Sequence, residues 1–177
     1  MLSETVEFSL PNGLQVVAVL SSATSEGVVL SVKRRPPQVK SFAELAQAGL
    51  LDDKQATALQ EAVREKRQLW FVGPTGPELS RLMAGALAAC PAEEGVALFE
   101  RSPEIALGER AALCLKLGVV SMDVLLERAR HFRPQRLVIH EPREDELAVV
   151  LTRLALRHDG SLVAFEHRSS KDTLSVF

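Results

Sequence analysis

The sequence has 177 residues, enough for one sizeable α/β core and a small appendage. Apolar residues make up 46% and charged residues 25%, as is ordinary for a soluble globular protein. The formal net charge of −2 gives no overall basic field, so nucleic acid is not an expected partner. No apolar run approaches the roughly 20 residues that cross a bilayer, and no N-terminal stretch resembles a signal peptide. We therefore expect a cytoplasmic protein without direct membrane insertion.

The first part of the chain has the pattern of β-structure. Val6 to Leu10 and Leu14 to Leu20 are apolar runs on either side of Pro11-Asn12-Gly13. Asn-Gly between two such runs predicts a hairpin, because both residues tolerate positive φ. A third apolar run follows before Pro36-Pro37 breaks the pattern. Residues 1–36 are therefore expected to be a β-rich remnant of an N-terminal domain with its linker.

Residues 37–177 alternate helices and strands. Ser41 with Glu44 has the pattern of a capping box, and Asp52-Asp53 begins a second helix. Apolar strands alternating with amphipathic helices predict a parallel sheet covered on both faces. Strands are expected at 69–72, 95–99, 112–117, 136–139 and 162–165, with helices at 78–89, 121–131 and 144–157. The two cysteines, Cys90 and Cys114, lie among apolar neighbours and are expected to be buried free thiols.

Four short segments of this second part carry a recognisable chemistry. The first runs from Gly73 to Ser80, Gly-Pro-Thr-Gly-Pro-Glu-Leu-Ser, between a strand and a helix. Strand, Gly-rich turn and helix in this order can bind phosphate through backbone N–H groups, although Gly-Pro-Thr-Gly alone is also an ordinary turn. The other three are Phe99-Glu100-Arg101-Ser102-Pro103-Glu104-Ile105, the stretch 128–143 with Arg133-Pro134-Gln135-Arg136 and Glu141-Pro142-Arg143, and His158-Asp159-Gly160-Ser161-Leu162.

In this order and at these separations, the four segments resemble the type II/type IV secretion ATPase family, especially tight-adherence (Flp-type, Tad) pilus and conjugation motors. Family members carry Gly-[Gly/Pro]-Thr-Gly-Ser-Gly-Lys-Thr, then Ile-Glu-Asp-x-x-Glu-Leu. They continue with Leu-Arg-x-Arg-Pro-Asp-Arg-Ile-Val-Val-Gly-Glu-x-Arg-Gly and Gly-His-Asp-Gly-Ser-[Leu/Met]-x-Thr-x-His. The resemblance covers residues from about 10 to 170. It implies a RecA-like P-loop NTPase core, with a mostly parallel sheet and helices on both faces, from a family of hexameric ATP-hydrolysing motors.

The resemblance also assigns site residues by their position in these motifs. Glu141 matches the carboxylate that serves the metal and the attacking water. For Glu141 with Arg143, a structural ion pair, a residual contact to nucleotide or magnesium, and a contact to a partner subunit all stay open. The assigned residues are Glu141, Glu100 and Glu104 for catalysis, and Gly73, Thr75, Gly76, Ser80 and Arg143 for nucleotide binding. No metal-ligating residues are expected.

Five departures from the family pattern count against ATP hydrolysis. Pro77 removes an N–H donor, Glu78 puts a negative charge where the family has Gly, and Leu79 replaces the phosphate-binding Lys. Arg101 stands at the Asp of the acidic segment, and Glu166 at the downstream His. We therefore predict a degenerate member, truncated at its C-terminus, that does not hydrolyse ATP. The Glu78 carboxylate could itself fill the phosphate site, or Pro77-Glu78 is only a good helix start.

The function expected is that of a pseudo-ATPase, a regulatory or structural partner of a type II/type IV secretion or Tad-type pilus machine. Its place would be the cytoplasm, peripherally at the inner face of the membrane, and its partner a motor ATPase or another machine component, with a homo-oligomer also possible. No cofactor is expected, unless residual binding of ATP and Mg²⁺ persists. One alternative is a residual ATPase that takes its cation from Arg81 or Lys33-Arg34-Arg35. The other is a stand-alone binding module on the same fold.

Overall fold

The chain divides into two compact units, Met1–Pro37 and Gln38–Phe177. The computed structural model describes residues 5–10, 14–20, 27–34, 41–74, 76–107, 110–154 and 159–167. In these residues no helix is long and apolar enough to cross a membrane.

The first unit is an antiparallel sheet of three strands in the order β1-β2-β3: β1 (Thr5–Ser9), β2 (Leu14–Val19) and β3 (Val29–Arg34). The predicted turn at Pro11-Asn12-Gly13 lies outside the described residues, but the antiparallel pairing on either side of it is observed. Phe8 pairs with Val16, and Val16 with Val32, so these apolar residues form one cross-strand row. Apolar side chains from all three strands thus lie on one face of this sheet.

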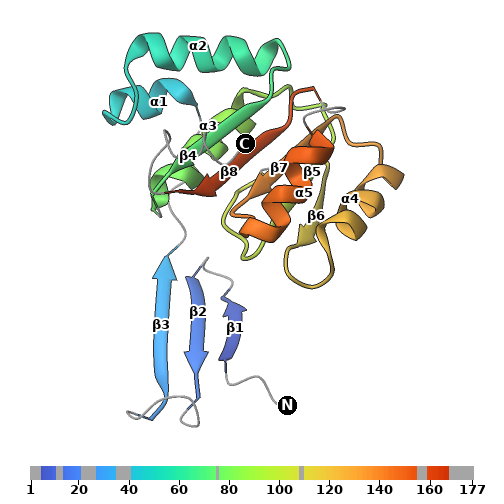
Figure 1. Ribbon diagram of the computed structural model, residues 1–177. Coiled ribbons are helices and arrows are strands. Elements are labelled where there is room, and N and C mark those ends of the chain that lie inside the picture. Colours follow the sequence, from blue (N-terminus) through green and yellow to red (C-terminus); the bar gives the residue numbers. More distant parts are fainter. Residues whose placement is uncertain are drawn as a thin grey trace. The chain divides into compact units, whose positions relative to one another are not determined.

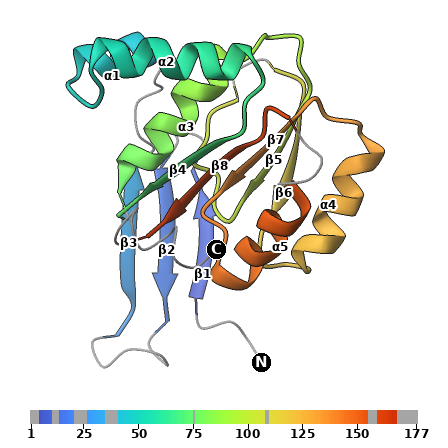
Figure 2. The same cartoon turned by 45° about the horizontal axis from the view of Figure 1, so that its top comes forward.

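The second unit is a five-stranded sheet with helices, as Figures 1 and 2 show. Its strand order is β4-β8-β7-β5-β6, and every pair of neighbours is parallel. The predicted α/β fold class is confirmed. The strands are β4 (Leu69–Gly73), β5 (Val96–Glu100), β6 (Ala112–Lys116), β7 (Arg136–His140) and β8 (Leu162–Glu166). The helices are α1 (Phe42–Gln47), α2 (Asp53–Arg64), α3 (Pro77–Ala89), α4 (Met122–His131) and α5 (Glu144–Leu154).

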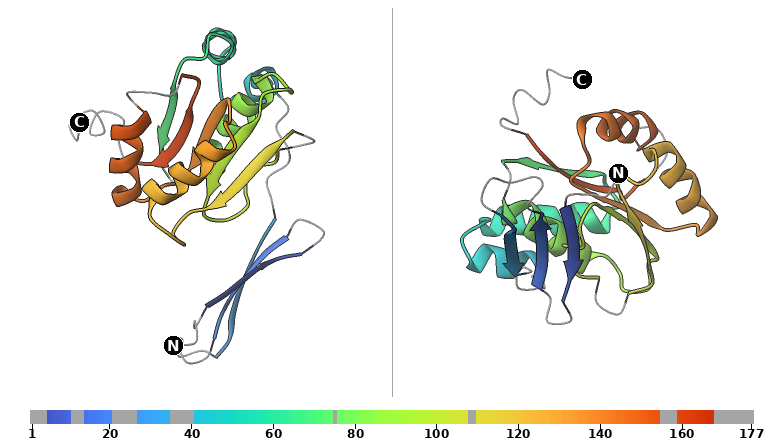
Figure 3. Two further views of the ribbon diagram at one scale, coloured as in Figure 1. Left: turned by 90° about the vertical axis from the view of Figure 1, so that its right-hand side faces the viewer. Right: turned by 90° about the horizontal axis from the view of Figure 1, so that it is seen from below.

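Helices cover both faces of this sheet, so it has two separate cores (Figure 3). One core joins α1, α2 and α3 to the strands, for example through Phe42, Met83 and Leu98. The other joins α4 and α5 to the opposite face, for example through Leu125 and Phe99. Adjacent residues of one strand alternate between the two cores, as Leu98 and Phe99 do, which is why these strands read as continuous apolar runs.

The first two helices begin at the predicted N-cap residues, but of the capping box expected for Ser41 with Glu44 only the Ser41 half forms. The Ser41 hydroxyl accepts the backbone N–H of Glu44 at 3.2 Å, and Asp52 forms a complete capping box with Gln55. Gly49 has φ 77° and follows α1, where a left-handed residue closes the helix end.

One predicted detail of the core is wrong. Cys90 is buried, but Cys114 is exposed. Cys114 lies in the middle of β6, which is the edge strand of the sheet, and the side chains of β6 alternate between exposed and half-buried. Apolar neighbours in sequence did not reveal that one face of this strand is left uncovered.

Candidate functional site

The candidate site lies at the carboxyl ends of β4, β5 and β7, which meet at one edge of the sheet because the strands are parallel. β4 ends at Gly73, and α3 begins at Pro77 with Gly76 as its N-cap, so the segment forms the predicted strand–turn–helix. Thr75 lies outside the described residues. Gly76 offers no side chain to cap α3, so the first N–H groups of the helix are left to other partners.

Glu78 lies at this helix start. A Cβ added to Gly76 would overlap Glu78 Oε2, so the carboxylate folds back over Gly76. The group is exposed and occupies the first turn of α3. A negative charge therefore stands where the positive end of the helix dipole would attract a phosphate.

Leu79, at the position of the family Lys, points into the protein. It is only 3% exposed and belongs to the core beneath α3 together with Phe71 and Met83. Its Cδ2 would be 3.7 Å from a Cβ built on Gly73, at the end of β4. The side chain that should carry a cation is thus part of the packing between α3 and the sheet.

Ser80, Glu104 and His140 form a hydrogen-bonded chain. The Ser80 hydroxyl donates to Glu104 Oε2 at 3.1 Å and lies 3.1 Å from His140 Nε2. Because the hydroxyl has a single proton, which Glu104 accepts, His140 must donate from Nε2–H, and this assigns its tautomer. Burial lowers the pKa of His140, and the nearby charges of Glu104 and Glu100 oppose that effect without overcoming it. The imidazole is therefore neutral near pH 7.

This chain of bonds does not activate a nucleophile. In a serine hydrolase the carboxylate orients the ring nitrogen opposite the serine, whereas here Glu104 contacts the serine itself. Ser80 is also only 4% exposed, so a substrate has no access to its hydroxyl. The arrangement fixes Ser80, Glu104 and His140 in place.

Glu100 acts on the loop that carries Glu104. Its Oε2 accepts the backbone N–H groups of Glu104 at 2.9 Å and Ile105 at 3.1 Å. Ile105 is buried in the core of α1 to α3, so the loop is anchored at both points. Glu100 thus positions Glu104 from the end of β5.

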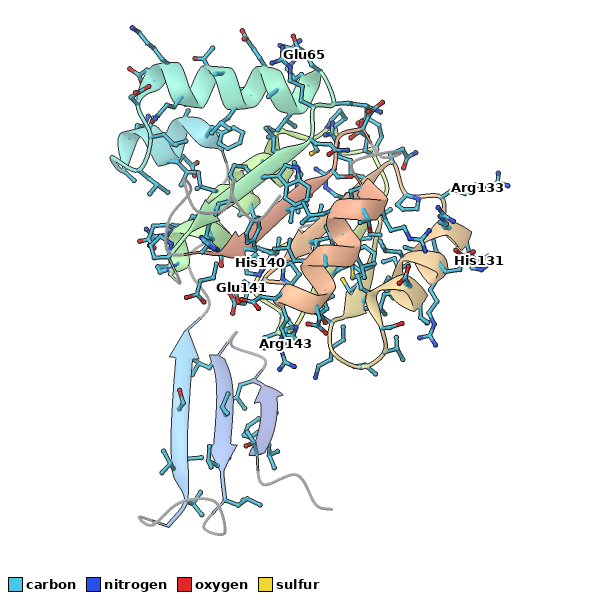
Figure 4. The ribbon with its side chains drawn as sticks, in the orientation of Figure 1. Glu65, His131, Arg133, His140, Glu141 and Arg143 are labelled. Atoms are coloured by element: carbon cyan, nitrogen blue, oxygen red, sulfur yellow. The ribbon has the colours of Figure 1, made fainter. Side chains whose placement is uncertain are left out.

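Glu141 and Arg143 follow β7 directly. Glu141 has φ 53°, a conformation that residues other than Gly rarely adopt, and its N–H donates to Ala164 O at 2.8 Å. Figure 4 shows His140, Glu141 and Arg143 together, with His131 and Arg133 apart from them near the end of α4. Of the predicted catalytic and binding residues, the structure therefore brings Ser80, Glu104 and Glu141 together, with His140 among them.

An open hollow of about 830 Å³ adjoins Glu141. Its lining carries more carboxylates than cations, because Arg143 is its one arginine and it has no lysine. Glu166, at the position of the family His, is part of this lining and lies beside Gly73 in the pairing of β8 with β4. The lining residues are Glu141, Pro142, Arg143, Glu144, Asp145, Glu166 and His167. A second hollow, of about 410 Å³ between α4 and α5, contains no predicted site residue.

Arg101, at the position of the family Asp, has a structural partner. Its Nη2 is 2.6 Å from Glu146 Oε2 in α5, and the same oxygen accepts the backbone N–H of Arg143 at 2.8 Å. The acidic segment is thus joined to the start of α5 by an ion pair.

Comparison with known structures identifies the fold. The Brucella suis VirB11 ATPase of a type IV secretion system, in complex with sulphate, matches 98% of this chain with a TM-score of 0.61 and 21% identity. The pilus retraction motor PilT with bound ADP matches 97% with a TM-score of 0.72 and 15% identity. The Legionella pneumophila ATPase DotB matches 98% with a TM-score of 0.61 and 16% identity.

This chain has the fold of the secretion and pilus ATPases. Two proteins from Mycobacterium tuberculosis strains CDC 1551 and H37Rv, each named as a conjugal transfer protein whose role is unproven, are 29% identical over 151 residues. A Methanocaldococcus jannaschii protein of uncharacterized function is 25% identical over 167 residues. No protein-family model matches the chain. The chain spans 43% of the length of the mycobacterial relatives and 50 to 59% of the solved structures.

Two of the motifs that resemble the secretion ATPases, Arg-Pro-x-Arg and Asp-Gly-Ser, meet at the amino ends of the strands, opposite the candidate site. Arg136 is 1% exposed, pairs through Nε with Glu94, and donates to Val63 O at 2.8 Å and Gly160 O at 3.2 Å. Lys66 adds a 3.2 Å contact to Glu94. Burial would raise the pKa of Glu94, but the hydrogen bonds from Arg136 and Lys66 outweigh it and hold that pKa below its usual value. Arg-Pro-x-Arg and Asp-Gly-Ser thus mark a structural joint at the amino ends of the strands.

Sequence reasoning missed His140. Its signal was available, because His140 stands where the secretion ATPase pattern has the Gly before the Glu. A single His at the end of an apolar strand carries no spacing that indicates its partners. Only the meeting of α3, the loop after β5 and β7 brings Ser80 and Glu104 to it.

Proposed function

We propose that this chain is a non-hydrolysing relative of the secretion and pilus ATPases, which acts as a regulatory or structural partner of such a machine. The observation that carries the proposal is Leu79, whose burial in the core leaves the loop without the cation that binds β- and γ-phosphates. Loss of one such transition-state contact commonly costs about 10²–10³ in rate.

Three further features support loss of hydrolysis. The Ser80 hydroxyl, which would hold Mg²⁺, is engaged by Glu104 and His140. The Glu78 carboxylate lies over the helix start that would receive a phosphate. The adjoining hollow offers mostly carboxylates to an anionic nucleotide. Each of these raises the free energy of a bound triphosphate.

The partner role is inferred from the relatives. The solved neighbours are ATPases of secretion and pilus systems, and a chain with their fold but without their chemistry can retain their contacts. We place it on the cytoplasmic side of a type II/type IV or Tad-type machine, beside an active motor ATPase.

The test has two arms. Phosphate release from Mg-ATP should stay at background for the unmodified chain, and co-expression with the motor ATPase of the same genome should give a complex on size exclusion. Phosphate release that Glu141→Gln abolishes would instead identify a residual ATPase. Absence of hydrolysis and of any complex with motor or machine components would favour a stand-alone binding module.

Leu79→Lys tests the key observation directly. We expect no gain of hydrolysis and a loss of about 2–5 kcal/mol in stability, because the substitution removes a core side chain and brings an ammonium group there. Denaturant unfolding and the phosphate assay measure the two effects. Arg81→Lys, at a half-buried position two residues along α3, is the control. Strong ATP hydrolysis by Leu79→Lys at unchanged stability would contradict the proposal.

A further inference from the structure

Three metal-ligating side chains converge at the candidate site. One ligand atom each of Glu104, His140 and Glu141 lies within 4.8 Å of the others. They come from separate parts of the chain: the loop after β5, the end of β7 and the turn after β7. His140 is 2% exposed, whereas Glu104 and Glu141 are half-buried. The cluster therefore has a closed side at the imidazole and an open side toward solvent.

The spacing of these atoms suits a small divalent ion. Donor atoms around a tetrahedral Zn²⁺, with bonds of about 2.0–2.2 Å, lie about 3.3 Å from one another. The observed separations, at most 4.8 Å, need to shorten by at most about 1.5 Å, which rotation of the glutamate side chains can supply. Ser80 Oγ lies 3.1 Å from both Glu104 Oε2 and His140 Nε2. It can therefore keep its hydrogen bond to Glu104 or act as a further ligand of the ion.

The altered phosphate loop brings no cation to the cluster. The position where an active phosphate loop presents a lysine is the buried, apolar Leu79, so no ammonium from this loop neutralises the two glutamates. Arg101 is already paired with Glu146. Glu141 also lines the open hollow of about 830 Å³, which gives an ion a path from solvent.

The imidazole sets the class of ion. Mg²⁺ and Ca²⁺ prefer oxygen ligands only, whereas one imidazole with two carboxylates suits Zn²⁺, Co²⁺ and related first-row ions. An ion of this class binds a histidine through the lone pair of one ring nitrogen, so binding at Nε2 of His140 would move the ring proton to Nδ1 and replace the hydrogen bond to Ser80.

We propose that Glu104, His140 and Glu141 bind one divalent transition-metal ion of the Zn²⁺ type. The ion would link the loop after β5 to the end of β7. The proposed metal site rests on the positions of the three side chains and does not depend on whether the chain hydrolyses ATP.

The experiment titrates the metal-free chain of 177 residues with Co²⁺, without nucleotide. We expect one Co²⁺ per chain, seen by its visible absorption, displaced by Zn²⁺ and unaffected by excess Mg²⁺. His140→Asn and Glu141→Gln should each weaken binding at least about tenfold, since loss of even a partner that orients a ligand costs about 10–100-fold. Added Zn²⁺ should raise the melting temperature of the unmodified chain and have no such effect on Glu141→Gln.

Two histidine variants separate this site from others. His131→Ala, at the exposed end of α4, should leave Co²⁺ binding unchanged. His167→Ala tests the outer hollow, which His167 lines beside Glu141. Binding that His167→Ala removes and His140→Asn preserves would overturn the proposal, as would a failure to bind Co²⁺ or Zn²⁺. If His140→Asn does not fold, Glu141→Gln decides, because its half-exposed side chain is not part of the core.

Discussion

At the scale of single residues, three substitutions relative to the family pattern each have a different structural outcome. Leu79 enters the core, Glu78 covers the helix start, and His140 forms a buried contact with Ser80. None of them leaves an unsatisfied polar group, since within the described residues no buried side-chain N or O lacks a hydrogen-bond partner. Each of the three side chains therefore has a defined structural role.

Ser80→Ala should measure the value of the hydroxyl that joins Glu104 to His140. Removing it leaves the buried Nε2–H of His140 without an acceptor, which costs about 1–3 kcal/mol. Urea unfolding should show this loss. Ser121→Ala is the matched control, because Ser121 makes no side-chain bond at the start of α4 and should change stability by less than about 0.5 kcal/mol. Equal effects of the two variants would show that the Ser80 contacts contribute nothing.

At the scale of secondary-structure elements, the sequence predicted the strands and helices of the second unit and their order well. Continuous apolar runs at β5 and β7 predicted strands covered on both faces, and both are fully buried. The exposure of Cys114 and the contacts of His140 could not be predicted, because each depends on which element lies beside the strand. A local sequence pattern predicts an element and which of its side chains are buried, but it does not determine which other elements pack against it.

The joint at the amino ends of the strands predicts an acid-sensitive contribution to stability. The pKa of Glu94 is below its usual value in the folded chain. The ionised carboxylate therefore stabilises the fold fully when the pH is above the usual pKa of a glutamate. This stabilisation is lost as the pH falls through the lowered folded pKa. Glu94→Gln should therefore cost about 3 kcal/mol at pH 7, by leaving Arg136 buried and unpaired, and progressively less below about pH 4.

Thermal or urea unfolding at a series of pH values measures this difference between Glu94→Gln and the unmodified chain. Glu65→Gln serves as the control, since Glu65 forms an exposed pair with Arg67 at the end of α2 (Figure 4). An exposed pair contributes little, so this variant should stay within about 1 kcal/mol at any pH. A difference for Glu94→Gln that does not shrink in acid would contradict the assignment.

Gly160 provides a second test of the same joint. It has φ 78°, and an added Cβ would lie 2.9 Å from Arg136 Nη1. Gly49 has φ 77° with open space around the added atom, so Gly49→Ala measures the backbone strain alone, about 1–2 kcal/mol. Gly160→Ala should cost clearly more, because Arg136 must also move. If Gly160→Ala and Gly49→Ala lose the same stability in denaturant unfolding, Arg136 can move aside at no measurable cost.

At the scale of the whole molecule, the second unit contains everything that its fold needs. Both cores belong to the sheet of β4 to β8 and its own helices. Residues 38–177 expressed alone should therefore unfold in one cooperative transition, with the mixed helix and strand signal of an α/β protein in circular dichroism. A fragment that lacks fixed tertiary structure would show that residues 1–37 are required for folding.

The burial of Leu79 has a consequence for the history of such a chain. Once a hydrophobic side chain at this position packs against Phe71 and Met83, a single change back to lysine first weakens the core and restores no phosphate contact by itself. Pro77 and Glu78 would also have to change before a phosphate could bind at the start of α3. The proposed loss of hydrolysis would in this sense be a step that single substitutions do not easily reverse, so that a descendant of this chain would more easily be selected for new binding than for renewed turnover.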